Sequence, residues 1–138
     1  MHQSKDTKLI LALDLPDKAN ALALLHKLKG NLDWVKIGLQ MFTAYGIDFV
    51  SEVKLLGFKV FLDLKLHDIP NTIAKTIQSL SKANIDMLTL HSFGGAEMLN
   101  YAYNAKTDYC PNIKLLSVTI LTSFNESTLN SLNVNKSI

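Results

Sequence analysis

The chain has 138 residues, of which 48% are hydrophobic and 19% charged, and its formal net charge is +2. This length suits one domain, and this apolar content is enough for a hydrophobic core. The small charge and the scattered basic residues give no support for nucleic-acid binding or for an anionic membrane surface. No apolar run approaches the ~20 residues of a membrane span, and no export signal precedes the first apolar run. With a single cysteine, Cys110, these features predict a soluble protein of the cytoplasm.

Five short runs rich in Leu, Ile, Val and Phe recur at a nearly constant spacing. They barely alternate between apolar and polar residues, which is typical of strands covered on both faces. Helical patterns lie between them, with glycine or proline at positions that suit helix boundaries. In chain order the sequence predicts a strand at 8–14, a helix at 17–28, a strand at 34–38, a helix at 40–56, a strand at 58–65, a helix at 70–80, a strand at 86–91, a helix after 94–95, a strand at 113–119 and the opening of another helix in 125–138.

This strand-helix alternation predicts an α/β fold with a parallel sheet. A dinucleotide-type open sheet would carry a glycine-rich turn after its first strand, but residues 14–18 read Asp-Leu-Pro-Asp-Lys. The polar residues favour a barrel instead, because each run carries them near its carboxyl end, where barrels hold their active sites. We therefore predict a (β/α)8 TIM barrel, of which the chain holds about the first five β/α units. The polar residues at this rim are Asp14, Lys36, Asp63, Lys65, His91, Thr119 and Thr122.

Asp63 and Lys65 are the most informative of these rim residues. Two positions apart on a strand, they point to one side, opposite to the leucines 62, 64 and 66. Buried ions are tolerated only when they are paired or functional, and Lys36 and Asp68 could complete an alternating acid-base array with them. Taken alone, the pattern Asp-x-Lys-x-x-Asp favours a structural ion-pair cluster. The strand spacing and the neighbouring residues favour an active site.

The stretch Phe61-Leu-Asp-Leu-Lys-Leu-His-Asp-Ile-Pro-Asn-Thr72 resembles the signature of bacterial orotidine 5′-phosphate decarboxylases. Shorter motifs extend the resemblance in the family's order and spacing over about residues 8–125. They are Leu-Ala-Leu-Asp14, Val-Lys36-Ile-Gly38, His91-Ser-Phe-Gly-Gly95 and Val118-Thr-Ile-Leu-Thr-Ser123.

The resemblance implies a barrel enzyme that converts orotidine 5′-monophosphate to UMP and CO2 without a metal or an organic cofactor. It implies that Lys65 protonates C6 of the pyrimidine and that Asp63 lies beside the departing carboxylate. Lys36 is expected to pair with the array and to contact the ribose.

The resemblance also implies a homodimer whose active sites lie at the subunit interface. Asp68 and Thr72 are expected to enter the partner subunit's site, where Thr72 contacts the ribose. Asp14 should hold ribose hydroxyls, and Thr122 should contact the pyrimidine ring. The histidines have no metal-ligand spacing, so no metal site is expected. His67 is expected to be a loop hydrogen-bond partner, whereas His91 could orient the site or cap its strand.

Eight units at this spacing need roughly 210–220 residues, so we expect a single barrel domain over 1–138 that stops before strands six to eight. The resemblance places a phosphate-binding arginine in the remaining part, and all fourteen basic residues of this chain are lysines. Without that anchor, the 138-residue molecule is expected to lack decarboxylase activity by itself.

Two alternatives stay open at this point. One is a related magnesium-dependent sugar-phosphate decarboxylase or aldolase of the same barrel superfamily, against which the His-Asp-Ile-Pro-Asn-Thr continuation at 67–72 argues. The other is a non-catalytic barrel fragment that serves as an interaction module.

Overall fold

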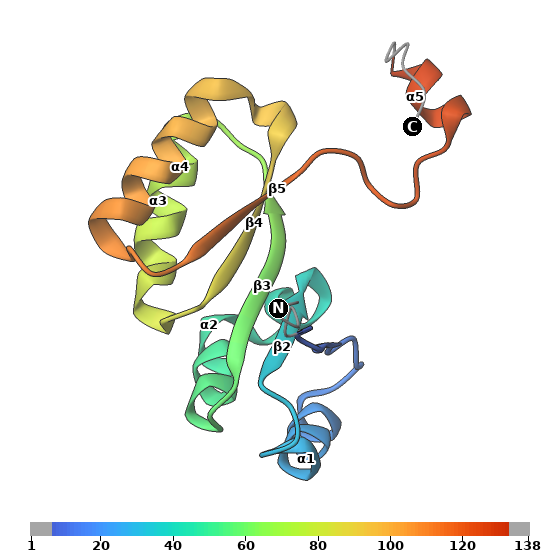
Figure 1. Ribbon diagram of the computed structural model, residues 1–138, viewed down its shortest axis with the longest axis vertical. Coiled ribbons are helices and arrows are strands. Elements are labelled where there is room, and N and C mark those ends of the chain that lie inside the picture. Colours follow the sequence, from blue (N-terminus) through green and yellow to red (C-terminus); the bar gives the residue numbers. More distant parts are fainter. Residues whose placement is uncertain (1–6, 133–138) are drawn as a thin grey trace, which may run out of the picture.

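The computed structural model describes residues 7–132, in which strands and helices alternate as the sequence predicts (Figure 1). Two short 3-10 helices, η1 (Ser81–Ala83) and η2 (Ser92–Gly94), accompany them. The predicted helix over 125–138 is present as α5, and its last residues, 133–138, lie outside the described part. The main elements are β1 (Ile10–Ala12), α1 (Lys18–Leu28), β2 (Trp34–Gly38), α2 (Leu39–Leu55), β3 (Lys59–Leu66), α3 (Pro70–Leu80), β4 (Met87–His91), α4 (Gly95–Tyr109), β5 (Lys114–Val118) and α5 (Glu126–Ser131).

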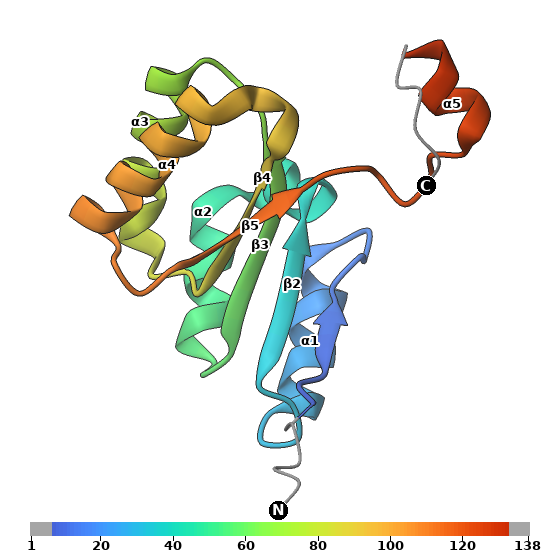
Figure 2. The ribbon, with the colours of Figure 1, turned by 45° about the horizontal axis from the view of Figure 1, so that its top comes forward.

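The five strands form one parallel sheet in the order β1-β2-β3-β4-β5. Because each strand pairs with the next one in sequence, right-handed crossovers place the connecting helices on the same face. Figure 2 shows α1 to α4 packed on that face, while the segment after β5 leads away from the sheet to α5. A doubly wound fold would reverse its strand order partway, so this topology is that of consecutive barrel units.

The hydrophobic core lies between the sheet and helices α1 to α4. In-register strand residues such as Ile37, Leu62 and Leu88 are fully buried on this face. The opposite face, which we call the inner face, carries Lys36, Phe61, Met87 and their in-register neighbours. On this inner face the side chains of the two edge strands, β1 and β5, are more accessible to solvent: Ile10 is 37% exposed and Leu116 is 40% exposed. Helix residues that complete the core include Leu25, Phe49, Val53, Ile73, Ile77 and Met98.

Local chemistry accounts for most helix boundaries. The Asp17 carboxylate accepts the backbone N–H of Asn20 at 2.8 Å and caps α1, and Pro70 occupies the first turn of α3. The continuous helix predicted over 40–56 is wrong in one respect, because α2 is interrupted at Gly46. Gly46 has φ 64° and ψ −161°, a backbone conformation essentially restricted to glycine. No helix within residues 7–132 is long and apolar enough to cross a membrane.

Candidate active site

The carboxyl end of β3 departs from a regular strand. Leu62 pairs with Leu88 and Leu66 with Leu90, so three residues of β3 lie opposite one residue of β4. Lys65, within this bulge, has φ 49°, in the left-handed region. For a lysine that conformation costs on the order of 1–2 kcal/mol, and bulges of this kind redirect side chains next to active sites. The expected simple alternation therefore extends through the buried Leu62 and Leu64 but is interrupted at Lys65.

Three of the predicted charged residues meet at this bulge. The Lys65 Nζ lies 2.9 Å from both carboxylate oxygens of Asp63, and the Lys36 Nζ lies 3.3 Å from Asp63 Oδ2. The Asp63 side chain is only 12% exposed, whereas the lysine side chains are 25% (Lys36) and 36% (Lys65) exposed. We call Lys36, Asp63 and Lys65 the charge array. One carboxylate thus holds two ammonium groups at the carboxyl ends of neighbouring strands.

A fourth residue, Thr89 of β4, contacts the array and was not predicted from the sequence. Its hydroxyl donates to Asp63 Oδ1 and accepts the Lys65 backbone N–H, each at 2.9 Å. Thr89 is 4% exposed. A lone threonine inside an apolar run carries no catalytic signal of its own, and only the strand pairing shows that it faces the charged end of β3.

The electrostatics of Asp63 follow from these contacts. Burial raises the pKa of Asp63, but hydrogen bonds from Lys65 and Thr89, the positive charge of Lys65 and a hydrogen bond from Lys36 outweigh it. The net result is a pKa below the ordinary value of 3.8. Asp63 is therefore a carboxylate at neutral pH, and its negative charge lies against two ammonium groups.

Asp14 and Lys36 border a space that a glycine keeps open. A Cβ atom on Gly38 would lie 3.6 Å from Asp14 Oδ1 and 4.0 Å from the Lys36 Nζ. Because Gly38 has no side chain, the Asp14 carboxylate and the Lys36 ammonium group both lie next to the space that its Cβ would occupy. Gly38 belongs to the motif Val-Lys36-Ile-Gly38, but the sequence alone does not show that it lies between these two charged groups.

The remaining predicted site residues lie apart from the array. Asp68 and Thr72 are exposed at the amino-terminal end of α3, where Asp68 Oδ1 accepts the Ile69 N–H at 2.7 Å. No hydrogen bond or ion pair joins Asp68 to the array within residues 7–132. Thr122 is exposed in the segment that leads from β5 to α5, away from the sheet (Figure 2). In a single chain the array therefore has three charged members rather than four.

A hollow of about 500 Å³ lies beside this rim, between the turns that follow β3 and β4. The His67 and His91 rings stack there with centroids 5.3 Å apart, and Phe93 stacks on His91 at 5.4 Å. His91 Nδ1 also accepts the Phe93 N–H at 3.3 Å, so in the structure it caps the turn after its strand. The predicted loop hydrogen bond of His67 is absent within the described residues, and ring stacking takes its place. The hollow is lined by His67, Asp68, Ile69, Pro70, Phe93 and Gly94.

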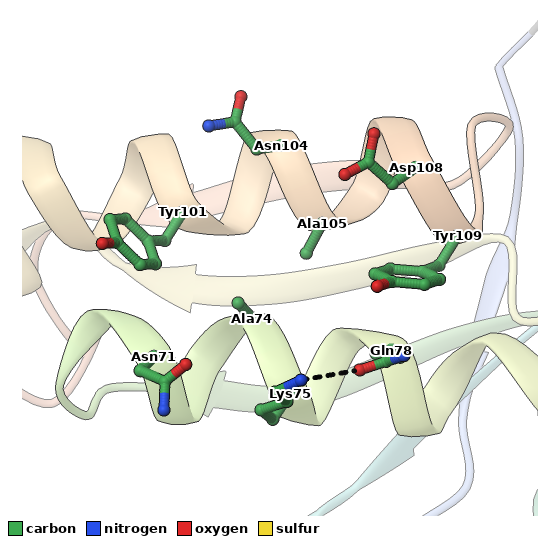
Figure 3. Close-up of a pocket in the computed structure, with 9 residues that line it drawn as sticks. All are labelled: Asn71, Ala74, Lys75, Gln78, Tyr101, Asn104, Ala105, Asp108 and Tyr109. Carbon is green, nitrogen blue, oxygen red and sulfur yellow. Dashed lines mark hydrogen bonds between the residues drawn. The ribbon is translucent and has the colours of Figure 1, made fainter.

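A separate groove of about 270 Å³ runs between α3 and α4 (Figure 3). Ala74 and Ala105 face each other across its middle, and Tyr101 and Tyr109 lie toward its two ends. No residue of the charge array lines it. The charged residues that the sequence predicts therefore lie at the strand ends and not in this groove.

Comparisons with known proteins agree with the sequence motifs. The family model described as "Orotidine 5'-phosphate decarboxylase / HUMPS family" matches residues 7–138. An orotidine 5′-phosphate decarboxylase of Opitutus terrae is 49% identical over 126 residues, which are 91% of this chain and 55% of that protein. One of Ehrlichia chaffeensis is 44% identical over 129 residues, 94% of this chain and 55% of that protein. The chain thus spans about half the length of these curated relatives.

Solved structures of orotidine 5′-phosphate decarboxylases also match this chain over part of their own length. The crystal structure of the Lactobacillus acidophilus orotidine 5′-phosphate decarboxylase matches with a TM-score of 0.85 at 35% identity, over 96% of this chain and 61% of that one. The Methanocaldococcus jannaschii enzyme complexed with the inhibitor BMP matches with a TM-score of 0.77 at 28% identity, over 91% of this chain and 57% of that one. The five-stranded sheet is therefore part of a TIM barrel. The chain belongs to the orotidine 5′-phosphate decarboxylase / HUMPS family.

Proposed function

We propose that the protein containing this chain is an orotidine 5′-phosphate decarboxylase, a lyase that converts orotidine 5′-monophosphate to UMP and CO2 in pyrimidine biosynthesis. The main structural support for this proposal is the charge array. It holds the Lys65 ammonium 2.9 Å from a carboxylate that also binds Lys36, at a barrel rim. The names of the relatives support the same reaction.

The reaction requires stabilisation of negative charge on a ring carbon. The bond between C6 and the carboxylate breaks, its electron pair stays on C6, and CO2 leaves. Resonance spreads that charge poorly, so a preorganised ammonium beside C6 stabilises it selectively as it develops. Lys65 then gives a proton from its Nζ to C6 and regains one from water. Each ~1.4 kcal/mol of selective stabilisation raises the rate tenfold.

The other members of the site have supporting functions in this proposal. Asp63 orients the Lys65 ammonium group through their ion pair, and it lies beside the substrate carboxylate, where repulsion is a secondary contribution. Lys36 and Asp14, which border the space at Gly38, bind the ribose. Thr122 contacts the pyrimidine ring once the segment after β5 is folded onto the barrel.

We further propose that the protein is a cytoplasmic homodimer that needs neither a metal nor an organic cofactor. Asp68 and Thr72 complete the partner subunit's site. Their exposed positions at the amino-terminal end of α3, with Asp68 outside its own array, support this arrangement. The chain itself supplies the first five units of an eight-unit barrel, and the phosphate-binding residues belong to the remaining units.

Replacing Lys65 by alanine in the active protein tests the catalytic assignment. The Lys65→Ala variant should form UMP at least about a thousandfold more slowly, because it lacks both the stabilising charge and the proton donor. Lys75→Ala is the matched control, since Lys75 is exposed on α3 and contacts Gln78. UMP formation by Lys65→Ala at the rate of Lys75→Ala would refute the proposal and favour a non-catalytic barrel.

Chelation separates this reaction from that of the magnesium-dependent sugar-phosphate enzymes of the same barrel superfamily. Dialysis against EDTA should leave UMP formation unchanged, because Lys65 alone supplies the positive charge at C6 in the proposed mechanism. Loss of activity with EDTA and its return with Mg²⁺ would favour the alternative class.

A further inference from the structure

Thr89 is the one buried polar or charged side chain in the part of the chain that the structure describes. A buried hydroxyl is tolerated when its hydrogen bonds are made, and both bonds of Thr89 go to the charge array. It donates to the Asp63 carboxylate and accepts the backbone N–H of Lys65. The hydroxyl therefore joins a side chain and a backbone group of the two central charged residues.

The position of Thr89 explains why the Lys65 backbone needs it. The Lys59 N–H donates to the Asp33 carbonyl on the β2 side, and bonding sides alternate along a strand, so in a regular ladder the Lys65 N–H would also face β2. The register shift between Leu62 and Leu66 accompanies a turn of this N–H toward β4, where the Thr89 side chain supplies the acceptor. The same bond holds Lys65 at φ 49°, a conformation that lysine adopts only when its surroundings impose it.

We propose that Thr89 is a positioning residue for the decarboxylation proposed above: its hydroxyl holds the Lys65 backbone and the Asp63 carboxylate in one orientation, so that the Lys65 ammonium is aimed at C6. This inference rests on the proposed function for its kinetic consequence. Its structural part, the coupling of Thr89 to Asp63 and Lys65, stands independently of that function.

The test compares Thr89→Val, which keeps the side-chain shape and removes the hydroxyl, with Thr89→Ser, which keeps the hydroxyl. In the active protein, Thr89→Val should lower kcat by at least about tenfold and change KM by less than about threefold, because the geometry of proton transfer is disturbed while the groups that bind substrate remain. Thr89→Ser should restore most of kcat. Thr107→Val on α4, whose hydroxyl donates to the Tyr103 carbonyl, is the control and should match wild type.

A second readout does not depend on activity. Carboxyl NMR should show the Asp63 titration of Thr89→Val moved to higher pH, because a hydrogen bond to the ionised form is lost. Amide exchange at Lys65 should be at least about tenfold faster, since its N–H has lost its acceptor. Thr89→Ser and Thr107→Val should resemble wild type in both measurements. If Thr89→Val does not fold, Thr89→Ser and Thr89→Ala provide the same comparison, because they differ only in the hydroxyl.

Each result decides the inference. An Asp63 titration and a Lys65 exchange rate unchanged in Thr89→Val would overturn it, whatever the activity. Changed NMR signals with an unchanged kcat would also overturn it, because the geometry would then be irrelevant to the reaction. If wild type forms no UMP, the proposed function fails by itself, and the NMR comparison alone still decides whether Thr89 positions the pair.

Discussion

At the scale of single residues, the site depends on one carboxylate that binds three side chains. Asp63 accepts hydrogen bonds from Lys36, Lys65 and Thr89 while its side chain is only 12% exposed. Removing its charge would leave two ammonium groups close together without a counterion. Because pairs that are partly shielded from water interact more strongly than surface pairs, Asp63 should matter for stability as well as for catalysis.

The pH dependence of the free energy of unfolding tests whether Asp63 stabilises the folded protein. The pKa of Asp63 is lower in the folded state than its ordinary value of 3.8, so its stabilising contribution is fully present above that value and is lost as the pH falls through the folded pKa. We expect Asp63→Asn to be less stable than wild type near neutral pH. The difference should shrink as the pH falls below 3.8. Urea unfolding of both proteins from about pH 6 to about pH 3 measures this, and a difference that grows toward acid would contradict it.

At the scale of elements, two departures from regular geometry shape the fold. The bulge in β3 places the Lys65 N–H opposite Thr89, and the interruption at Gly46 divides α2. A Cβ added at Gly46 would have nothing within 4 Å, so the reason for glycine is the backbone conformation and not a lack of space. Helical periodicity alone could not reveal this break, because the apolar stripe continues on both sides of it.

Gly46→Ala should therefore destabilise the protein by about 1–3 kcal/mol, the cost of forcing a side chain into a glycine-only conformation. Gly38→Ala is the matched control for stability. Its backbone is extended, with φ −93°, and its nearest neighbour would be 3.6 Å away, an ordinary contact. The urea midpoints of the two variants provide the comparison. Equal urea midpoints for Gly46→Ala and Gly38→Ala would contradict this prediction, because they would show that the backbone at residue 46 accepts a side chain without loss of stability.

At the scale of the whole molecule, the proposed homodimer has a consequence for how its active sites are assembled. Asp68 lies outside the array of its own chain, so in the proposed dimer each site takes Lys65 from one subunit and Asp68 from the other. A mixed dimer of Lys65→Ala and Asp68→Ala would then contain one site with both residues intact and one with neither.

Mixing the two inactive variants under conditions that exchange subunits should recover about a quarter of the wild-type activity, because about half of the dimers are mixed and each has one intact site. The separate variants, incubated in the same way, are the controls. If Asp68 served its own chain, every site would lack one residue and no activity would return.

The sequence by itself determined the order of the strands, their parallel arrangement and the rim on which Lys36, Asp63 and Lys65 meet. These features follow from apolar periodicity and from the period of two along a strand, which are local properties. The tertiary structure decided the left-handed backbone of Lys65, the contact with Thr89, the space at Gly38 and the break at Gly46. Each of these depends on how one strand is paired with the next or on a backbone angle, and because such features arise from contacts between distant residues, no pattern of residue types along the chain reveals them.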